Sequence, residues 1–261
     1  MLLGQIPGVG GGENLRWHKM NGHHSPFLTA TWRDLVLLTF EVDPEPLLDF
    51  LPPGVALDPW QGKHLLTLVG LHLRDIRVQG VPVPFHRSYP QVNLRFYVRR
   101  RCDNQWRRGV VFVKQIVPGK LVALVARWRY QEKVAASPVR HNATASGAGA
   151  SRRVCYRWRG PAAWNSVSVS AAGAPEHSRP GSLEEFVAER YYGYNARRDG
   201  STLEYRIEHP RWRIQRASDP ELVCDVAGVF GLGFVDSLGR PPLSALVAEG
   251  SAVVVHRAVR V

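Results

Sequence analysis

The stretch YPQVNLRFYVRRR, residues 89–101, alternates with the two-residue period of a β-strand, and both faces of that strand are informative. One face carries three apolar side chains, Leu94, Phe96 and Val98. The other carries an amide, a guanidinium and a phenol, from Asn93, Arg95 and Tyr97. Beyond the turn residues CDNQ, the segment WRRGVVFVKQIV (106–117) continues as a second strand. A long hairpin of this kind requires a sheet, whose polar face is either solvated or lines a pocket.

The remaining periodic segments predict a sheet protein with a few helices. Apolar runs and alternation favour strands at 26–42, 64–76, 134–141, 152–159, 201–210 and 251–261. Helices are expected at 43–54 with Asp43 as N-cap, at 118–133, at 220–231, and after Ser182, which forms a capping box with Glu185. Because strands and helices do not alternate regularly, we predict an α+β fold around a largely antiparallel sheet.

The composition is that of a folded, soluble domain. The chain has 261 residues, of which 44% are hydrophobic and 21% charged. No apolar run approaches the roughly 20 residues needed to span a bilayer, so we expect a cytoplasmic protein that does not contact membranes. The Gly-, Asn- and His-rich residues 1–26 are expected to be disordered, with Met20 as an alternative start. Residues 27–261 are expected to form one domain.

The net charge of +12 raises the question of a nucleic-acid partner. The basic residues are 29 arginines and five lysines, and they are scattered through strand-like segments. Only VRRR (98–101) and RRGV (107–110) cluster, on either side of the predicted hairpin turn. This pattern favours a solvated sheet edge over a nucleic-acid surface.

Nothing in the spacing of cysteines and histidines predicts a metal or a cofactor. Cys102, Cys155 and Cys224 are widely spaced, so reduced structural thiols are expected. The histidines form no H-E-x-x-H motif, and neither His64 nor His72 has an acidic partner that the sequence identifies. The glycine-rich GVFGLGF segment lacks a dinucleotide or phosphate-loop signature, and we expect it to be a helix end followed by a turn.

Several landmarks, taken in order, resemble one family. They include LPPGVALD, GVPVPFHRSYPQVNLRFYV, YQEKVAASPVRH, SLEEFVAERYYGY and TLEYRIEHPRWRI, and the resemblance extends over about residues 27–261. The chain is similar to the YqjF-like family, a bacterial family of unknown function. This resemblance implies an acetoacetate-decarboxylase-like fold, a curved antiparallel β-barrel with a few packed helices that encloses a small-molecule cavity.

With this fold assumed, alternate residues of each strand face the lumen. We therefore predict that Asn93, Arg95 and Tyr97, with Gln91, bind a small anionic ligand, with Arg95 holding a carboxylate. Arg140 and His141 are expected on a strand that borders the same cavity. Glu204, Tyr205 and His209 are weaker candidates.

Acetoacetate decarboxylases use a lysine that condenses with the substrate ketone, and they carry it in a Pro-Lys-Lys run. This chain has YQEKVAASP at the similar position, so that Lys133 stands alone beside Glu132, and Gln91 replaces a catalytic glutamate. These departures count against Schiff-base decarboxylation.

Three hypotheses follow. The first is a binding protein for a small anionic molecule. The second is a lyase-like enzyme that acts on a keto acid through Lys133, His141 and Glu132. The third is a basic surface for nucleic acid or an acidic protein. Self-association is left open.

Overall fold

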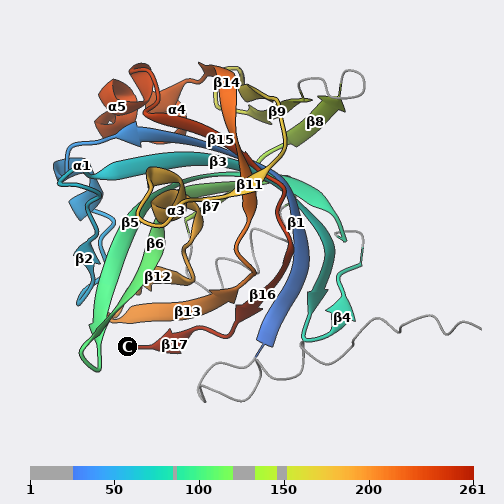
Figure 1. Cartoon of the computed structure of the whole chain (residues 1–261). Helices are drawn as coiled ribbons and strands as arrows, with labels where there is room; N and C mark the ends of the chain where they lie inside the picture. Colours follow the sequence, from blue (N-terminus) through green and yellow to red (C-terminus); the bar gives the residue numbers. More distant parts are fainter. Residues whose placement is uncertain (1–25, 85–86, 120–132, 146–151) are drawn as a thin grey trace, which may run out of the picture.

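The computed structural model describes residues 26–84, 87–119, 133–145 and 152–261 (Figure 1). The strands of the first half are β1 (Pro26–Glu41), β2 (Ala56–Leu57), β3 (Leu65–Val78), β4 (Val81–Pro82), β5 (Tyr89–Cys102), β6 (Gln105–Val117), β7 (Val134–Ala136) and β8 (Val139–Ala145). Those of the second half are β9 (Arg152–Arg159), β10 (Trp164–Ala171), β11 (Glu176–His177), β12 (Tyr192–Ala196), β13 (Thr202–Glu208), β14 (Arg213–Val223), β15 (Ser244–Ala248), β16 (Ala252–His256) and β17 (Val259–Arg260). The helices are short: α1 (Glu45–Leu48), α3 (Leu183–Ala188), α4 (Val226–Val229), the 3-10 helix η2 (Leu232–Phe234) and α5 (Val235–Gly239).

The central sheet curves until its pairing returns to the strand where it began (Figure 1). β1 pairs with β3, β3 with β5, and β5 with β6, all antiparallel. β6 then pairs with β12 in parallel, and β12 leads through β13 and β16 back to β1. The curved, mainly antiparallel α+β fold predicted from the sequence is therefore confirmed.

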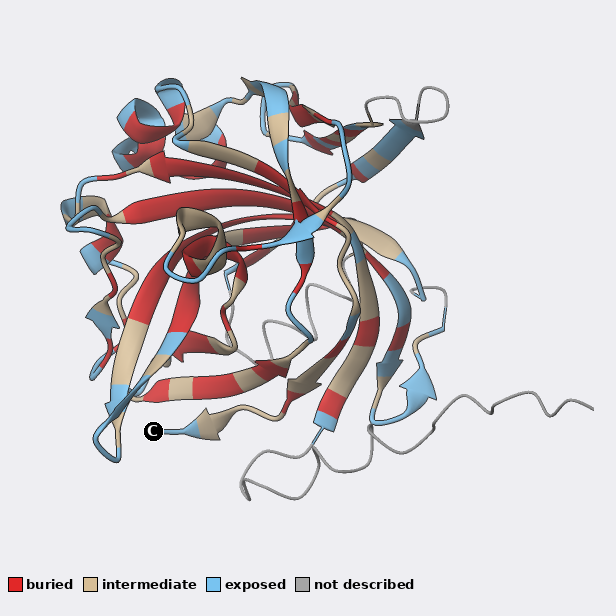
Figure 2. Cartoon of the chain, viewed as in Figure 1, coloured by how far each residue is buried: buried red, intermediate tan, exposed pale blue. Residues whose placement is uncertain are grey.

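A second set of strands branches from this circuit and covers its outside. The second half of β1 pairs with β15, which leads through β14, β10 and β9 to β8. The outer core lies between the two layers and contains Leu94, Phe96 and Val98 of β5 together with Tyr156 and Trp158 of β9. Figure 2 shows the resulting run of buried residues along β3, β5 and β15.

A separate inner core fills the other face of the same strands. Leu71 and Leu73 of β3 and Tyr97 of β5 belong to it, as do Phe186 and Val187 of α3. The short helix α3 thus packs against the inner face of the circuit. Its start agrees with the predicted cap, because the Ser182 hydroxyl accepts a hydrogen bond from the Glu185 amide at 3.2 Å.

Several predicted boundaries were wrong. The first helix covers only Glu45–Leu48 and begins after Pro44 rather than being capped by Asp43. The helix predicted at 220–231 is α4 alone, because β14 continues through Val223. The predicted strand at 134–141 is divided into β7 and β8, and the closing strand into β16 and β17.

Two predictions concern residues that the structure does not describe. The disordered segment at 1–26 falls almost wholly there, as does most of the helix expected at 118–133. None of the helices formed by the described residues has the length and apolar character required to span a membrane.

Candidate functional site

The polar row of β5 lies on the inner side of the sheet, opposite the residues that enter the outer core. Its members are all buried: Gln91, Asn93, Arg95 and Tyr97. Arg95 is 8% exposed, which places its guanidinium away from bulk solvent. The two-residue alternation predicted for this strand therefore holds through its centre.

The two ends of the row are hydrogen-bonded to neighbouring strands. Gln91 donates from Nε2 to Gln115 Oε1 at 2.6 Å. The Tyr97 hydroxyl is 2.6 Å from Thr67 Oγ1, which in turn is 3.0 Å from Thr39 Oγ1. These contacts fix the two ends of the row to β6 and to β3 and β1.

The middle of the row is less well satisfied. Arg95 donates from Nη2 to the backbone carbonyl of Val187, in the last turn of α3, at 3.1 Å. Arg95 Nε and Asn93 Oδ1 are buried without a hydrogen-bond partner among the described residues. No carboxylate in that part of the chain lies within ion-pair distance of Arg95. A buried guanidinium held by one carbonyl is therefore the most conspicuous polar group of the inner face.

The charge of Arg95 also acts on His209, a partly buried residue that follows β13. Burial lowers the pKa of His209, and the positive charge of Arg95 lowers it further. Its ring stacks on Trp212 at 4.1 Å between centroids and lies 4.8 Å from the Tyr191 ring. Its Nδ1 is 2.9 Å from the Pro210 carbonyl oxygen, to which a ring N–H donates, and burial disfavours the charged imidazolium.

A cleft of about 560 Å³ opens beside α3. Its charged and polar lining includes Arg108, Glu185, Glu189, Arg190, Tyr191 and Arg211. Tyr191, on this wall, also contacts the His209 ring.

Most charges in the cleft are already paired. Arg190 donates to Asp58 Oδ2 at 2.7 Å, and both side chains are almost fully buried. Arg211 is 2.8 Å from Glu185. Arg108 is the most exposed of the three cations and reaches Asp58 Oδ2 at 3.4 Å. Among these three cations, Arg108 is therefore the most accessible to solvent.

The other predicted site residues do not lie beside Arg95. The amine of Lys133 lies 3.6 Å from the Phe50 ring centroid, and partial burial lowers its pKa. Arg140 stacks on Trp164 at 4.7 Å on the outer layer. Glu204 is fully buried and pairs with Arg107 at 2.5 Å. Glu132 lies outside the described residues.

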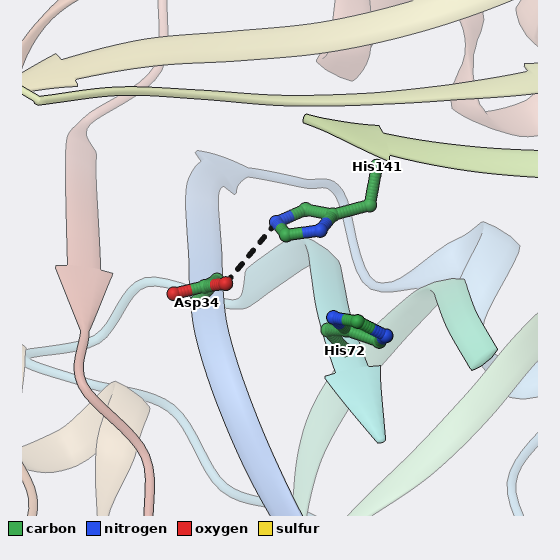
Figure 3. Close-up of side chains that lie close together, drawn as sticks. All are labelled: Asp34, His72 and His141. Carbon is green, nitrogen blue, oxygen red and sulfur yellow. Dashed lines mark ion pairs between the residues drawn. The ribbon is translucent and has the colours of Figure 1, made fainter. Parts of the chain in front are cut away.

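His141 instead belongs to a cluster that the sequence did not predict (Figure 3). Its Nε2 is 3.3 Å from Asp34 Oδ2, and its ring is 4.9 Å from the ring of His72. Burial lowers the pKa of His72 to about 4, with help from His141 and Arg74, and burial also lowers the pKa of His141. These residues come from β8, β1 and β3, and no sequence spacing links them.

The closed circuit of strands has the acetoacetate-decarboxylase-like fold, as comparison with solved structures shows. The chain is similar to an acetoacetate decarboxylase-like enzyme from Sphingomonas wittichii RW1, with a TM-score of 0.64, 13% identity, and coverage of 91% of this chain and 94% of that one. It is also similar to the enduracididine biosynthesis enzyme MppR, complexed with the condensation product of pyruvate and imidazole 4-carboxaldehyde. That comparison has a TM-score of 0.62, 11% identity, and coverage of 99% and 98%. At these identities the likeness concerns the fold alone.

Within that class, residues 29–252 match the family DUF2071, described as an uncharacterized conserved protein, and the chain belongs to this family. It is 25% identical over 211 residues to the uncharacterized protein YqjF of Bacillus subtilis (strain 168), covering 80% of this chain and 84% of that protein. The resemblance to the YqjF-like family is thereby confirmed.

Proposed function

We propose that this protein binds a small organic anion through a carboxylate, with Arg95 as the principal contact. The observation that carries the proposal is a buried guanidinium whose one hydrogen bond within the described chain goes to the Val187 carbonyl. Moving a charged group out of water costs several kcal/mol unless an opposite charge or enough hydrogen bonds compensate. A ligand carboxylate would supply that compensation, because it matches the planar donor fork of arginine.

The surroundings of Arg95 favour a ligand with a second polar group. Asn93, two residues earlier on the same face, has a buried Oδ1 without a partner in the described part of the chain, so it can accept from a ligand hydroxyl or hydrate. A hydroxy acid, or the hydrate of an oxo acid, would satisfy both Arg95 and Asn93. The MppR complex, whose ligand derives from pyruvate, is a precedent on a similar fold.

The enzyme alternative receives less support from the geometry. Val134 is buried with Val117, whereas the side chain of the preceding residue, Lys133, extends to Phe50. Lys133 and Arg95 therefore do not converge on one substrate. We expect borohydride reduction in the presence of acetoacetate or pyruvate to leave Lys133 unmodified. A reduced adduct on Lys133, identified by mass spectrometry, would restore the enzyme hypothesis.

Titration calorimetry with matched ligands tests the proposal. Pyruvate, acetoacetate and lactate are compared with their methyl esters, which keep the shape but lose the charge. We expect at least one acid to bind with one site per chain and its ester to bind at least about tenfold more weakly, since a charge-assisted hydrogen bond contributes about 1.5–3 kcal/mol. Equal binding of acid and ester, or no binding by any acid, would refute the proposal.

A further inference from the structure

The Asp34, His72 and His141 cluster lies apart from the inner row. His72 follows Leu71 and precedes Leu73, which belong to the inner core, so its side chain projects from the opposite, outer face of β3. His141 comes from β8 of the covering layer, and Asp34 comes from β1. The three side chains meet where the two layers join (Figure 3).

We propose that these three residues form a binding site for a divalent transition-metal ion such as Zn²⁺. Each offers one ligand atom, and the three ligand atoms lie within 4.8 Å of one another. Ligand atoms about 2.0–2.2 Å from a common ion are roughly 3–3.5 Å apart. The Asp34 Oδ2–His141 Nε2 distance of 3.3 Å already has this value. Two histidines and one carboxylate leave coordination positions open for water or a substrate.

The hydrogen bonding of the two histidines supports the assignment. The Nε2 of His72 is 3.0 Å from Ser88 Oγ, whereas its Nδ1 is buried and has no partner among the residues described. A metal-binding histidine has this arrangement, because one ring nitrogen is held by an outer hydrogen bond while the other faces the ion. His141 Nε2 is likewise buried and makes no hydrogen bond within the described chain, although Asp34 is 3.3 Å away.

The local backbone fixes the carboxylate in place. Asp34 has a positive φ of 56°, at an irregularity where the pairing of β1 with β3 shifts register between Arg33 and Val36. Such bulges redirect a side chain, and they recur beside functional sites. The Tyr156 hydroxyl donates to the Asp34 carbonyl at 2.8 Å, which anchors the bulge to β9.

Two arginines set the expected strength of the site. Arg152 donates to Asp34 Oδ1 and thereby leaves Oδ2 for the ion. Arg74 lies near both histidines, and with Arg152 it makes the local charge positive. Both charges oppose a cation, so we expect micromolar rather than nanomolar affinity for Zn²⁺.

The proposal is tested by measuring metal binding to the full chain, after the protein has been treated with a chelator. Calorimetry with Zn²⁺ and visible absorption with Co²⁺ are compared for the wild type and for H72Q, H141Q and D34N. The control is H177A, which removes a histidine that is exposed on the surface. We expect the wild type and H177A to bind one ion per chain. Each ligand variant that folds should bind that ion at least about tenfold more weakly or not at all.

One ligand variant that retains the wild-type circular dichroism spectrum is sufficient to test whether its side chain binds the ion. S88A retains all three ligand residues and should weaken binding by about 10–100-fold through loss of the outer hydrogen bond. Equal Zn²⁺ affinity and Co²⁺ spectra in the wild type and the folded ligand variants would overturn the assignment, as would an absence of binding by the wild type. Neither result bears on carboxylate binding at Arg95, because Arg95 lies on the inner face of the sheet and His72 projects from the outer face.

Discussion

Replacing Arg95 with methionine separates a ligand-binding role from a structural one. The change removes one charge-assisted hydrogen bond to the Val187 carbonyl, which contributes about 1.5–3 kcal/mol. It also removes the desolvation cost of a buried guanidinium, of order several kcal/mol, and methionine fills much of the same volume. The two effects offset each other or favour the variant. We therefore expect the free energy of unfolding of the ligand-free R95M protein to equal or exceed that of the wild type.

The response to ligand should be the opposite. At a ligand concentration of about 100 times Kd, binding stabilises the wild type by about 2.7 kcal/mol. In a domain of this size, 1 kcal/mol corresponds to a change of about 2–4 °C in Tm. Differential scanning calorimetry should thus record a ligand-induced rise of about 5–11 °C for the wild type. R95M should show a rise of less than about 1 °C.

The surface variant R240M is the control, since Arg240 is exposed, and it should behave as the wild type does. If R95M lowers the Tm of the ligand-free protein by more than about 4 °C, Arg95 serves mainly to hold α3. If R95M and the wild type respond equally to the ligand, the anion binds elsewhere. Either result would refute the reasoning from an uncompensated buried charge.

Three further predictions follow from buried groups. D58A leaves Arg190 without its carboxylate and should lower the free energy of unfolding by about 3–5 kcal/mol in urea titrations. The control E221A breaks an exposed ion pair and should lower it by less than about 1 kcal/mol. Equal losses in the two variants would contradict this prediction. G70A introduces a Cβ 2.3 Å from a tyrosine ring and should destabilise by about 1–3 kcal/mol, so an unchanged Tm would count against the packing described. Because burial lowers the pKa of His209 in the folded state, its contribution is present above pH 6.5 and is lost as the pH falls below that value. H209Q should therefore lose less stability than the wild type between pH 6.5 and 5, and parallel losses would argue against a buried neutral imidazole.

Local periodicity predicted that Asn93, Arg95 and Tyr97 share one face of a strand, but only the fold implied by the family resemblance predicted that this face is the inner one, and neither predicted its contacts. The alternation along β5 assigns Leu94 and Arg95 to opposite faces, and burial of one face follows from the apolar side chains themselves. The bond from Arg95 to Val187 joins segments far apart in the chain, so no local pattern indicates it.

The same limit explains the separation of the other candidates. Lys133 and Val134 are consecutive in an extended segment, so their side chains point in different directions, and the sequence alone does not say which one faces inward. The Asp34, His72 and His141 cluster depends on a bulge and on the packing of two layers. Neither feature leaves a recognisable spacing in the sequence.

Helix boundaries were predicted less well than strand positions. Helices do form within the ranges predicted at 43–54 and 220–231, yet they contain only four residues each. Pairing of β14 with β10 keeps Glu221 and Leu222 extended, because a sheet partner satisfies their backbone groups better than an isolated helical turn does.

Because the two faces of β5 pack into two different cores, the middle of the strand should tolerate insertions much less well than its end. One residue inserted between Val92 and Val98 would exchange the two faces beyond the insertion, forcing guanidinium and amide groups among outer-core side chains and leucine or phenylalanine toward the inner wall. An insertion at the Asp103–Asn104 turn, where both residues have positive φ and the hairpin reverses, changes neither face. Natural length variation among relatives should therefore be concentrated at that tip and excluded from the middle of the strand.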